Sequence, residues 1–415
     1  MAMKTYRILS AAFVVGALAA APALAEDVKI GALYPLSGNA ANAGKSALDA
    51  VELAVDLVNT VHPELSGLPS VGKGGLSNMG GAKIQLISAD HQGKPEEGQS
   101  QTLRLITQEH VVALIGAYQS NVTFTATAVS ERQGIPFVVG DSVASNITSR
   151  GFKYLVRVTP IASDFAKNYM EYLGDMKKAG HKVDSIAVVN ENTDYGTSVA
   201  STLLEQAKSH GITVAAQIPY SANSTDVSAQ VLQLKEKNPD CVIFVSYTAD
   251  AILYLKTMKN LNYLPPMIIG DDSGFSDPSF VPAVGDIAQG VMNRSAWAVG
   301  KPMSITRRIN DLFKAKTGHE LDDTSARSMQ AMLVLADAIN RAGSTAPDKI
   351  MAALRATDLK PNEIIMGYHG VKFDQVGENS LAATYLVQLQ GKDYVSVWPE
   401  KSATAEVQWP MKGWK

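Results

Sequence analysis

Polar side chains that could bind a small molecule follow two neighbouring apolar segments of this sequence. Gln119, Ser120 and Asn121 come after the apolar run 111–115, and Asp141-Ser142-Val143 comes after the run 135–139. A predicted helix separates the two runs, so the order is strand, polar loop, helix, strand, polar loop. Both loops would then lie at the carboxyl ends of parallel strands, which is the edge where open α/β sheets bind ligands.

The second half of the chain offers further side chains of the same kind. Tyr195 and Tyr247 each lie between a predicted strand and a predicted helix, where a ring can cover an apolar ligand body and the hydroxyl can form a hydrogen bond. Ordinary loop packing is the alternative for either tyrosine. Asp271 and Asp272 follow the run 267–269, and either carboxylate could pair with a cationic ligand group or form a turn or helix cap.

Motifs for catalysis and for metal or nucleotide binding are missing from the sequence. The loop from Gly38 to Ser46 resembles a phosphate-binding loop but has five residues between its glycines, where that motif needs four. The chain has no G-x-S-x-G or H-E-x-x-H motif, and its seven histidines are scattered. We therefore predict no catalytic residues, no metal and no cofactor. An exported enzyme is the weaker alternative, because no nucleophile–base pair can be recognised.

The N-terminus is typical of a secretory signal peptide, which we assign to residues 1–25. Lys4 and Arg7 precede the apolar segment 8–18, and Ala23-Leu24-Ala25 supplies the cleavage site. No later segment is long and apolar enough to span a bilayer, so we predict an exported protein without direct membrane insertion. The chain has 37 basic and 40 acidic residues, and this weak acidity argues against nucleic acid as a partner.

Strands and helices alternate throughout the predicted mature chain, which indicates an α/β fold with parallel, doubly wound sheets. A first series of apolar strands ends near residue 158, and a second series begins at 186. About 390 mature residues exceed what one hydrophobic core usually serves, so we predict two lobes joined by about three crossover strands. The predicted division is 26–157 plus 297–374 for lobe 1, 158–296 plus 375–400 for lobe 2, and 401–415 for a C-terminal tail. Within lobe 1 the Gly-, Pro- and Ser-rich segment 62–81 is predicted to be a surface excursion.

Six stretches, in this order and spacing, resemble the type I solute-binding proteins of ABC transporters, in particular the branched-chain amino acid (Leu/Ile/Val) class. They are KIGALYPLSG at 29–38, LIGAYQSNVT at 114–123, GIPFVVGDS at 134–142, RGFKYLVRVTP at 150–160, NENTDYG at 190–196 and the run 270–274. The resemblance covers essentially the whole mature chain. It implies a periplasmic protein of two lobes that close on one small-molecule ligand and deliver it to a membrane permease. We expect a monomer.

The resemblance also implies roles for individual residues. Ser120 and the loop 141–143 correspond to the family's ligand-carboxylate site, and Gln119 adjoins it. Tyr195 and Tyr247 match the aromatic positions of the second lobe, and Asp272 matches the acid that binds the ligand ammonium. Hydroxyls and N–H groups at helix starts suit a carboxylate, and a carboxylate suits an ammonium.

Asp141 departs from the family pattern, which has a small neutral residue in this loop. A carboxylate that faces the cleft would repel a ligand carboxylate, whereas Asp141 could otherwise cap a helix. The ligand class therefore stays open between a leucine-like amino acid, another amino acid, an amide, a polyol and an aromatic acid. A sensor of the same fold, signalling through a membrane receptor, is the alternative to a transport component.

Overall fold

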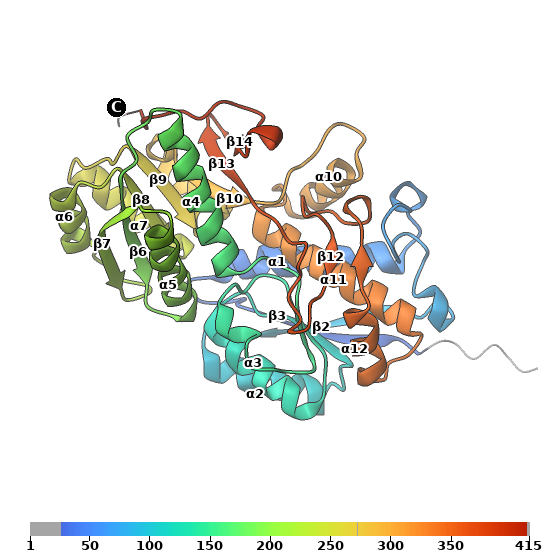
Figure 1. Cartoon of the computed structure of the whole chain (residues 1–415). Coiled ribbons are helices and arrows are strands. Elements are labelled where there is room, and N and C mark those ends of the chain that lie inside the picture. Colours follow the sequence, from blue (N-terminus) through green and yellow to red (C-terminus); the bar gives the residue numbers. More distant parts are fainter. Residues whose placement is uncertain (1–25, 272, 413–415) are drawn as a thin grey trace, which may run out of the picture.

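The computed structural model describes residues 26–271 and 273–412, which form two α/β lobes side by side (Figure 1). The predicted signal peptide and the predicted ligand residue Asp272 lie outside the described residues. In the part that is described, none of the helices combines the length and the hydrophobicity that a membrane span requires. The predicted fold class, two lobes of largely parallel sheets, is confirmed.

The first lobe is built on a parallel sheet with the strand order β2-β1-β3-β4-β5. The order reverses between β1 and β3, so a crevice opens at the carboxyl ends of these strands. Helices α1 and α11 cover one face of the sheet, and α2 and α3 cover the other (Figure 1). The elements of the sheet and these faces are β1 (Val28–Tyr34), α1 (Ala41–Asn59), β2 (Ile84–Asp90), α2 (Pro95–Thr107), β3 (Ala113–Gly116), α3 (Ser120–Gln133), β4 (Phe137–Val139), β5 (Leu155–Arg157) and α11 (Asp323–Ala342).

Smaller elements complete the first lobe. Helices α10 and α12 pack against α1 and α11 respectively, and a two-stranded antiparallel sheet, β11 with β12, follows in the chain. The segment predicted as a surface excursion packs on α11, where Asn340 Oδ1 accepts a hydrogen bond from the Asn78 N–H at 2.9 Å. The bounds are α10 (Ile305–Thr317), α12 (Pro347–Arg355), β11 (Asp358–Leu359) and β12 (Val371–Lys372).

The second lobe is built on a seven-stranded sheet with the order β14-β13-β10-β9-β8-β6-β7. Helices α4 and α5 cover one face and α6 and α7 the other, while two short helices, α8 and α9, follow β9. The elements are α4 (Ala162–Lys178), β6 (Ser185–Glu191), α5 (Asp194–Ser209), β7 (Thr213–Tyr220), α6 (Ser228–Lys237), β8 (Cys241–Val245), α7 (Thr248–Asn260), β9 (Met267–Asp271), α8 (Ser273–Ser276), α9 (Phe280–Val284), β10 (Met292–Ser295), β13 (Tyr385–Gln390) and β14 (Asp393–Trp398).

Three features of the fold differ from the sequence prediction. Helix α4 was not predicted, although its buried residues, among them Phe165, Tyr169 and Leu173, recur at helical spacing. Helix α1 begins at Ala41, inside the segment predicted as a polar loop. Strands β13 and β14 run antiparallel to their neighbours, because a short hairpin turn joins them where a parallel connection would need a long crossover.

Three chain segments connect the lobes, and backbone hydrogen bonds hold each of them to a neighbouring part of the chain. The first follows β5, the second follows β10, and the third precedes β13 (Figure 1). The Arg157 N–H donates to the Gly377 carbonyl at 2.8 Å, which joins the first segment to the third. The Gly367 N–H donates to the carbonyl of Ala296, on the second segment, at 2.7 Å.

Helix α11 is the central helix of the first lobe and is buried along almost its whole length. A helix buried on every side must find partners for each of its polar side chains. Gln330, for example, accepts a hydrogen bond from the Ile365 N–H at 2.7 Å. Its N-terminus is closed by a reciprocal cap, in which Asp322 Oδ1 accepts from the Ser325 N–H at 2.7 Å and Ser325 Oγ accepts from the Asp322 N–H at 2.9 Å.

The other carboxylate oxygen of Asp322 is buried and has no hydrogen-bond partner among the described residues. Burial raises the pKa of Asp322 from 3.8 to about 6, against the opposing effect of the hydrogen bonds from Ser325. A group whose pKa is higher in the folded state stabilises the protein fully at low pH, and this contribution is lost as the pH rises through the folded pKa.

We expect Asp322→Asn to stabilise the protein at neutral pH. The amide oxygen can still cap α11, but the side chain cannot ionise, so the variant and the natural protein should match near pH 4 and diverge by up to about 3 kcal/mol at pH 7. Denaturant unfolding across this pH range measures the difference. Asp322→Ala, which also removes the cap, is the control. A constant difference between Asp322→Asn and the natural protein would contradict the assigned pKa.

Candidate functional site

A pocket lies between the lobes, where the loops after β3 and β4 of the first lobe face the loops after β6 and β8 of the second. Its cavity volume is only about 10 Å³, so the facing side chains nearly fill it. Six of the predicted ligand residues line it: Ser120, Asp141, Ser142, Val143, Tyr195 and Tyr247. The structure adds Tyr118 and Arg327, which were not predicted. Gln119 lies outside this pocket and lines an adjoining compartment of the same cleft.

Buried His91 positions the loop that carries Tyr118 and Ser120. Its Nδ1 lies 3.1 Å from the Gly93 N–H and therefore accepts, so Nε2 carries the proton that is donated to the Ala117 carbonyl at 2.9 Å. Burial lowers the pKa of His91 to about 4, so the ring is neutral at pH 7. The imidazole thus holds the backbone next to Tyr118, which itself has a positive φ of 71°.

Hydroxyl groups form hydrogen bonds between the two loops of the first lobe that line the pocket, those after β3 and β4. Ser142 Oγ donates to the Tyr118 carbonyl at 2.9 Å and lies 2.5 Å from Thr123 Oγ1. Ser120 Oγ accepts the Ala144 N–H at 3.3 Å. These contacts place the hydroxyls of Ser120 and Ser142 at the pocket wall and hold both loops in one arrangement.

Asp141 lines the pocket, but its carboxylate is held by α11. Oδ2 accepts a hydrogen bond from Ser328 Oγ at 2.5 Å, and Oδ1 lies 4.0 Å from Arg327 Nε. The Asp141 carbonyl also accepts from Arg327 Nη1 at 3.3 Å. Asp141 caps no helix among the described residues. The adjacent guanidinium offsets the negative charge, so repulsion of a ligand carboxylate is weaker than the sequence alone suggested.

Three tyrosine rings meet across the pocket. The centroids of Tyr195 and Tyr247, both in the second lobe, are 5.3 Å apart, and Tyr247 lies 6.0 Å from Tyr118 of the first lobe. The Tyr195 hydroxyl lies 2.9 Å from Asp271 Oδ2, and the Tyr169 hydroxyl donates to Oδ1 at 2.5 Å. The carboxylate at the end of β9 thus fixes the orientation of Tyr195. Asp272, the predicted partner of a ligand ammonium, is not described.

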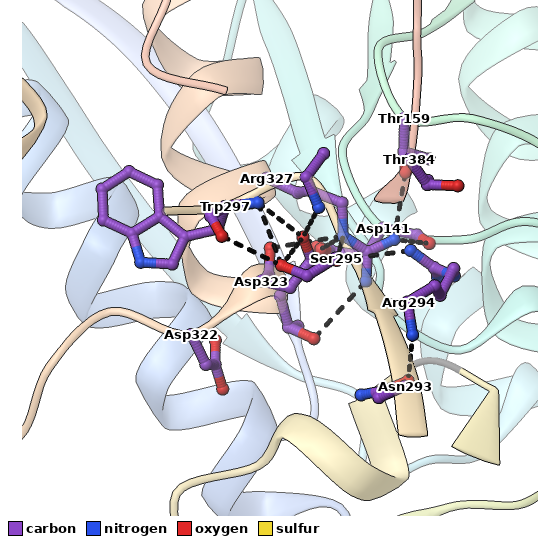
Figure 2. A network of polar contacts seen from close by, with 12 residues as sticks. Asp141, Thr159, Asn293, Arg294, Ser295, Trp297, Asp322, Asp323, Arg327 and Thr384 are labelled. Atoms are coloured by element: carbon purple, nitrogen blue, oxygen red, sulfur yellow. Dashed lines mark hydrogen bonds and ion pairs between the residues drawn. The ribbon is translucent and has the colours of Figure 1, made fainter. Parts of the chain in front are cut away.

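Behind the pocket, Asp323 joins α11 to the second connecting segment (Figure 2). Its Oδ1 accepts from the N–H groups of Ala296 at 2.7 Å and Trp297 at 3.2 Å. Its Oδ2 lies 3.1 Å from Arg327 Nε and 3.3 Å from Arg294 Nη1, and both arginines are buried. One carboxylate therefore contacts a connecting segment and the arginine that holds the ligand loop at residue 141.

A second buried arginine holds the same loop from the end of β5, where the first connecting segment begins. Arg157 pairs with Glu378 through two hydrogen bonds, of 2.9 Å at Nε and 2.5 Å at Nη2. It also donates from Nη1 to the carbonyls of Ser142 at 3.1 Å and Ala144 at 2.8 Å. Arg157 and Arg327 had no local signal in the sequence, since each acts on residues far away in the chain.

The fold and the site define a class of protein: two α/β lobes with three connections and a ligand pocket between them are the architecture of a bilobal solute-binding protein. The chain belongs to the periplasmic binding protein family, whose model matches residues 27–393. It is 33% identical over 390 residues to Leu/Ile/Val-binding protein homolog 8 of Brucella abortus, covering 92% of this chain and 93% of that protein. Homolog 7 of Brucella suis is 31% identical, with 94% and 96% covered.

Solved structures show the same fold. The branched-chain amino acid transporter substrate-binding protein LivJ of Streptococcus pneumoniae, in complex with isoleucine, has a TM-score of 0.75 and 22% identity, covering 93% of this chain and all of that one. A solute-binding protein of R. palustris in complex with benzoate has a TM-score of 0.73 and 20% identity, covering 89% and 95%. The predicted resemblance to the Leu/Ile/Val-binding class is thereby confirmed.

We expect Asp323→Asn to lower the free energy of unfolding by roughly 3 kcal/mol or more. The amide can keep the acceptor for the 296–297 backbone, but it removes the charge that compensates buried Arg294 and Arg327. Denaturant unfolding measures the loss. Ser295→Ala is the control, because it removes one hydrogen bond to the same carboxylate, worth about 1 kcal/mol. Equal stability of the two variants would show that the charge network contributes little.

Proposed function

We propose that the protein is the periplasmic substrate-binding component of an ABC importer. It captures an amino acid or a related small polar compound between its lobes by hinge closure and presents it to a membrane permease. The observation that carries this proposal is that residues of both lobes line one pocket. The proposed lobes are 26–157 plus 297–374 and 158–296 plus 375–400, and the proposed mature protein begins at Glu26 and is a monomer.

Contacts across the cleft support hinge closure. Asn39 of the first lobe donates to Asn223 Oδ1 of the second at 2.7 Å, and the Ser145 N–H donates to Ser198 Oγ at 3.1 Å. A ligand can reach the buried pocket only when these contacts separate, and the three connecting segments provide the hinge. Ligand binding then favours the closed state through the contacts that it makes with both lobes.

The protein is proposed to bind without catalysing a reaction. Its hydroxyl groups at the pocket are engaged with neighbouring loops, and neither Ser120 nor Ser142 has a histidine among its hydrogen-bond partners in the described chain. The sequence relatives are named as Leu/Ile/Val-binding protein homologues, and these names describe binding and no reaction.

A thermal-shift screen of the mature protein tests the function. Because relatives and fold neighbours are described as binding Leu, Ile, Val or benzoate, the panel holds amino acids, their amides, polyols and small aromatic acids. A compound present at a hundred times its Kd adds about 2.7 kcal/mol of stability, which is visible as a higher Tm. A panel without a single stabilising compound would contradict the proposal.

Tyr195→Ala is expected to weaken binding of a compound found by the screen at least tenfold without unfolding the protein. The variant removes a ring from the pocket wall, while Tyr195→Phe keeps the ring and loses only the hydroxyl contacts with Asp271. Tyr263→Phe is the matched control, because Tyr263 is buried in the second-lobe core and its hydroxyl has no partner among the described residues. Titration calorimetry measures all three, and unchanged affinity in Tyr195→Ala would refute the site.

A further inference from the structure

The cleft continues from the tyrosine-lined pocket into a second, larger space. The cavity volume of this outer compartment is about 340 Å³, against about 10 Å³ for the inner pocket. Tyr247 lines both spaces, and Gln119 and Ser120 are neighbours in the chain on either side of the boundary. The two spaces are therefore neighbours in one cleft, and one molecule can contact the walls of both.

The lining of the outer compartment has an unusual chemistry. Side-chain amides from both lobes face it: Asn39, Gln92, Gln119, Asn121 and Asn223. None of the described residues that line it carries a carboxylate. Lys94, the single charged side chain among them, is exposed and donates to Gln92 Oε1 at 3.1 Å. An amide offers both donors and an acceptor, so a set of amides matches groups that do the same, such as peptide amides and hydroxyls.

A second, independent observation concerns the hydrogen bonding of the Gln119 side chain. Its Oε1 is buried and accepts no hydrogen bond from the described part of the chain. The Gln119 amide lies close against Gly93, where a Cβ would stand only 2.8 Å from Nε2. A buried acceptor without a donor is costly, and a donor on a bound molecule would satisfy it.

We propose that the outer compartment is a second subsite, which binds an uncharged, hydrogen-bonding extension of the ligand. The proposal rests on the function proposed above and narrows the ligand class to molecules longer than a free amino acid. A compact head would lie against the tyrosine rings of the inner pocket, and an amide or polyol arm would lie among the side-chain amides. The cross-lobe bond from Asn39 to Asn223 uses one donor and one acceptor, so each side chain keeps a further group for the arm.

Matched probes test the subsite. Two heads, leucine and benzoic acid, are each coupled through the carboxyl group to four arms: glycinamide, glucamine, glycine and butylamine. The primary amide of each head is the reference, and titration calorimetry measures the affinity ratio of each probe to its reference. The glycinamide arm represents an amide, glucamine a polyol, glycine an anion and butylamine an apolar chain.

We expect at least one of the probes with a glycinamide or glucamine arm to bind tenfold or more tighter than its reference compound. The butylamine arm should leave the affinity equal to that of the reference. The gain should disappear in the double variant Asn39→Leu, Asn121→Leu and persist in Lys94→Gln. Using the ratio cancels any effect of Asn39 on closure itself, because the reference compound experiences the same closure.

Other results would overturn the proposal. If a reference compound binds and neither polar arm improves it, the outer compartment is not a subsite, while the proposed function stands. If the glycine arm binds best and Lys94→Gln abolishes its gain, the compartment recognises charge instead. If the screen finds a different compound, unchanged affinity for it in the double variant also refutes the subsite. Failure of every probe and every panel compound counts against the proposed function itself.

Discussion

The structure depends on how the charges buried on one helix are balanced. Helix α11 passes through the core of the first lobe and brings Asp323 and Arg327 to the base of the cleft. Neither charge could remain there alone, because an uncompensated buried charge costs several kcal/mol. Asp323 therefore contacts Arg294 and Arg327, and Arg327 in turn lies beside Asp141 of the ligand loop. The loop that contains Asp141, helix α11 and the second connecting segment are thus linked into one electrostatic unit by these charged side chains.

This unit explains how the pocket and the hinge can be linked in such a protein. The Asp323 carboxylate holds the backbone of the second connecting segment, and Arg157 on the first holds the carbonyls of Ser142 and Ala144. Both arginine–carboxylate systems reach from a connecting segment to the loop 141–144. The loop 141–144 and two of the connecting segments are therefore held by the same charged side chains. The second lobe takes part through Phe165, on which Arg294 stacks at 3.6 Å.

The interpretation of Asp141 from the sequence differs from what the structure shows. In the sequence it is an unpaired acid in a loop expected to bind a carboxylate, and it raised doubt about a leucine-like ligand. In the structure Ser328 donates a hydrogen bond to it and the guanidinium of Arg327 lies beside it, although both residues are almost two hundred positions away in the chain. Asp271, by contrast, orients Tyr195 in the structure, although the resemblance to the family assigned the ligand role to Asp272. The surroundings of each carboxylate are thus set by partners that local patterns cannot reveal.

The sequence by itself determined the α/β class, the alternation of strands and helices, and six of the residues that meet in the pocket. These features could be predicted because the spacing of apolar residues and the polar residues that follow a strand are local signals in the sequence. It missed α4, whose periodic signal was present, and the antiparallel end of the second sheet. Only the tertiary structure decided where Tyr118, Arg157 and Arg327 lie. Their roles come from contacts between segments far apart in the chain. The role of a charged or aromatic side chain cannot be assigned until the residues packed against it are known.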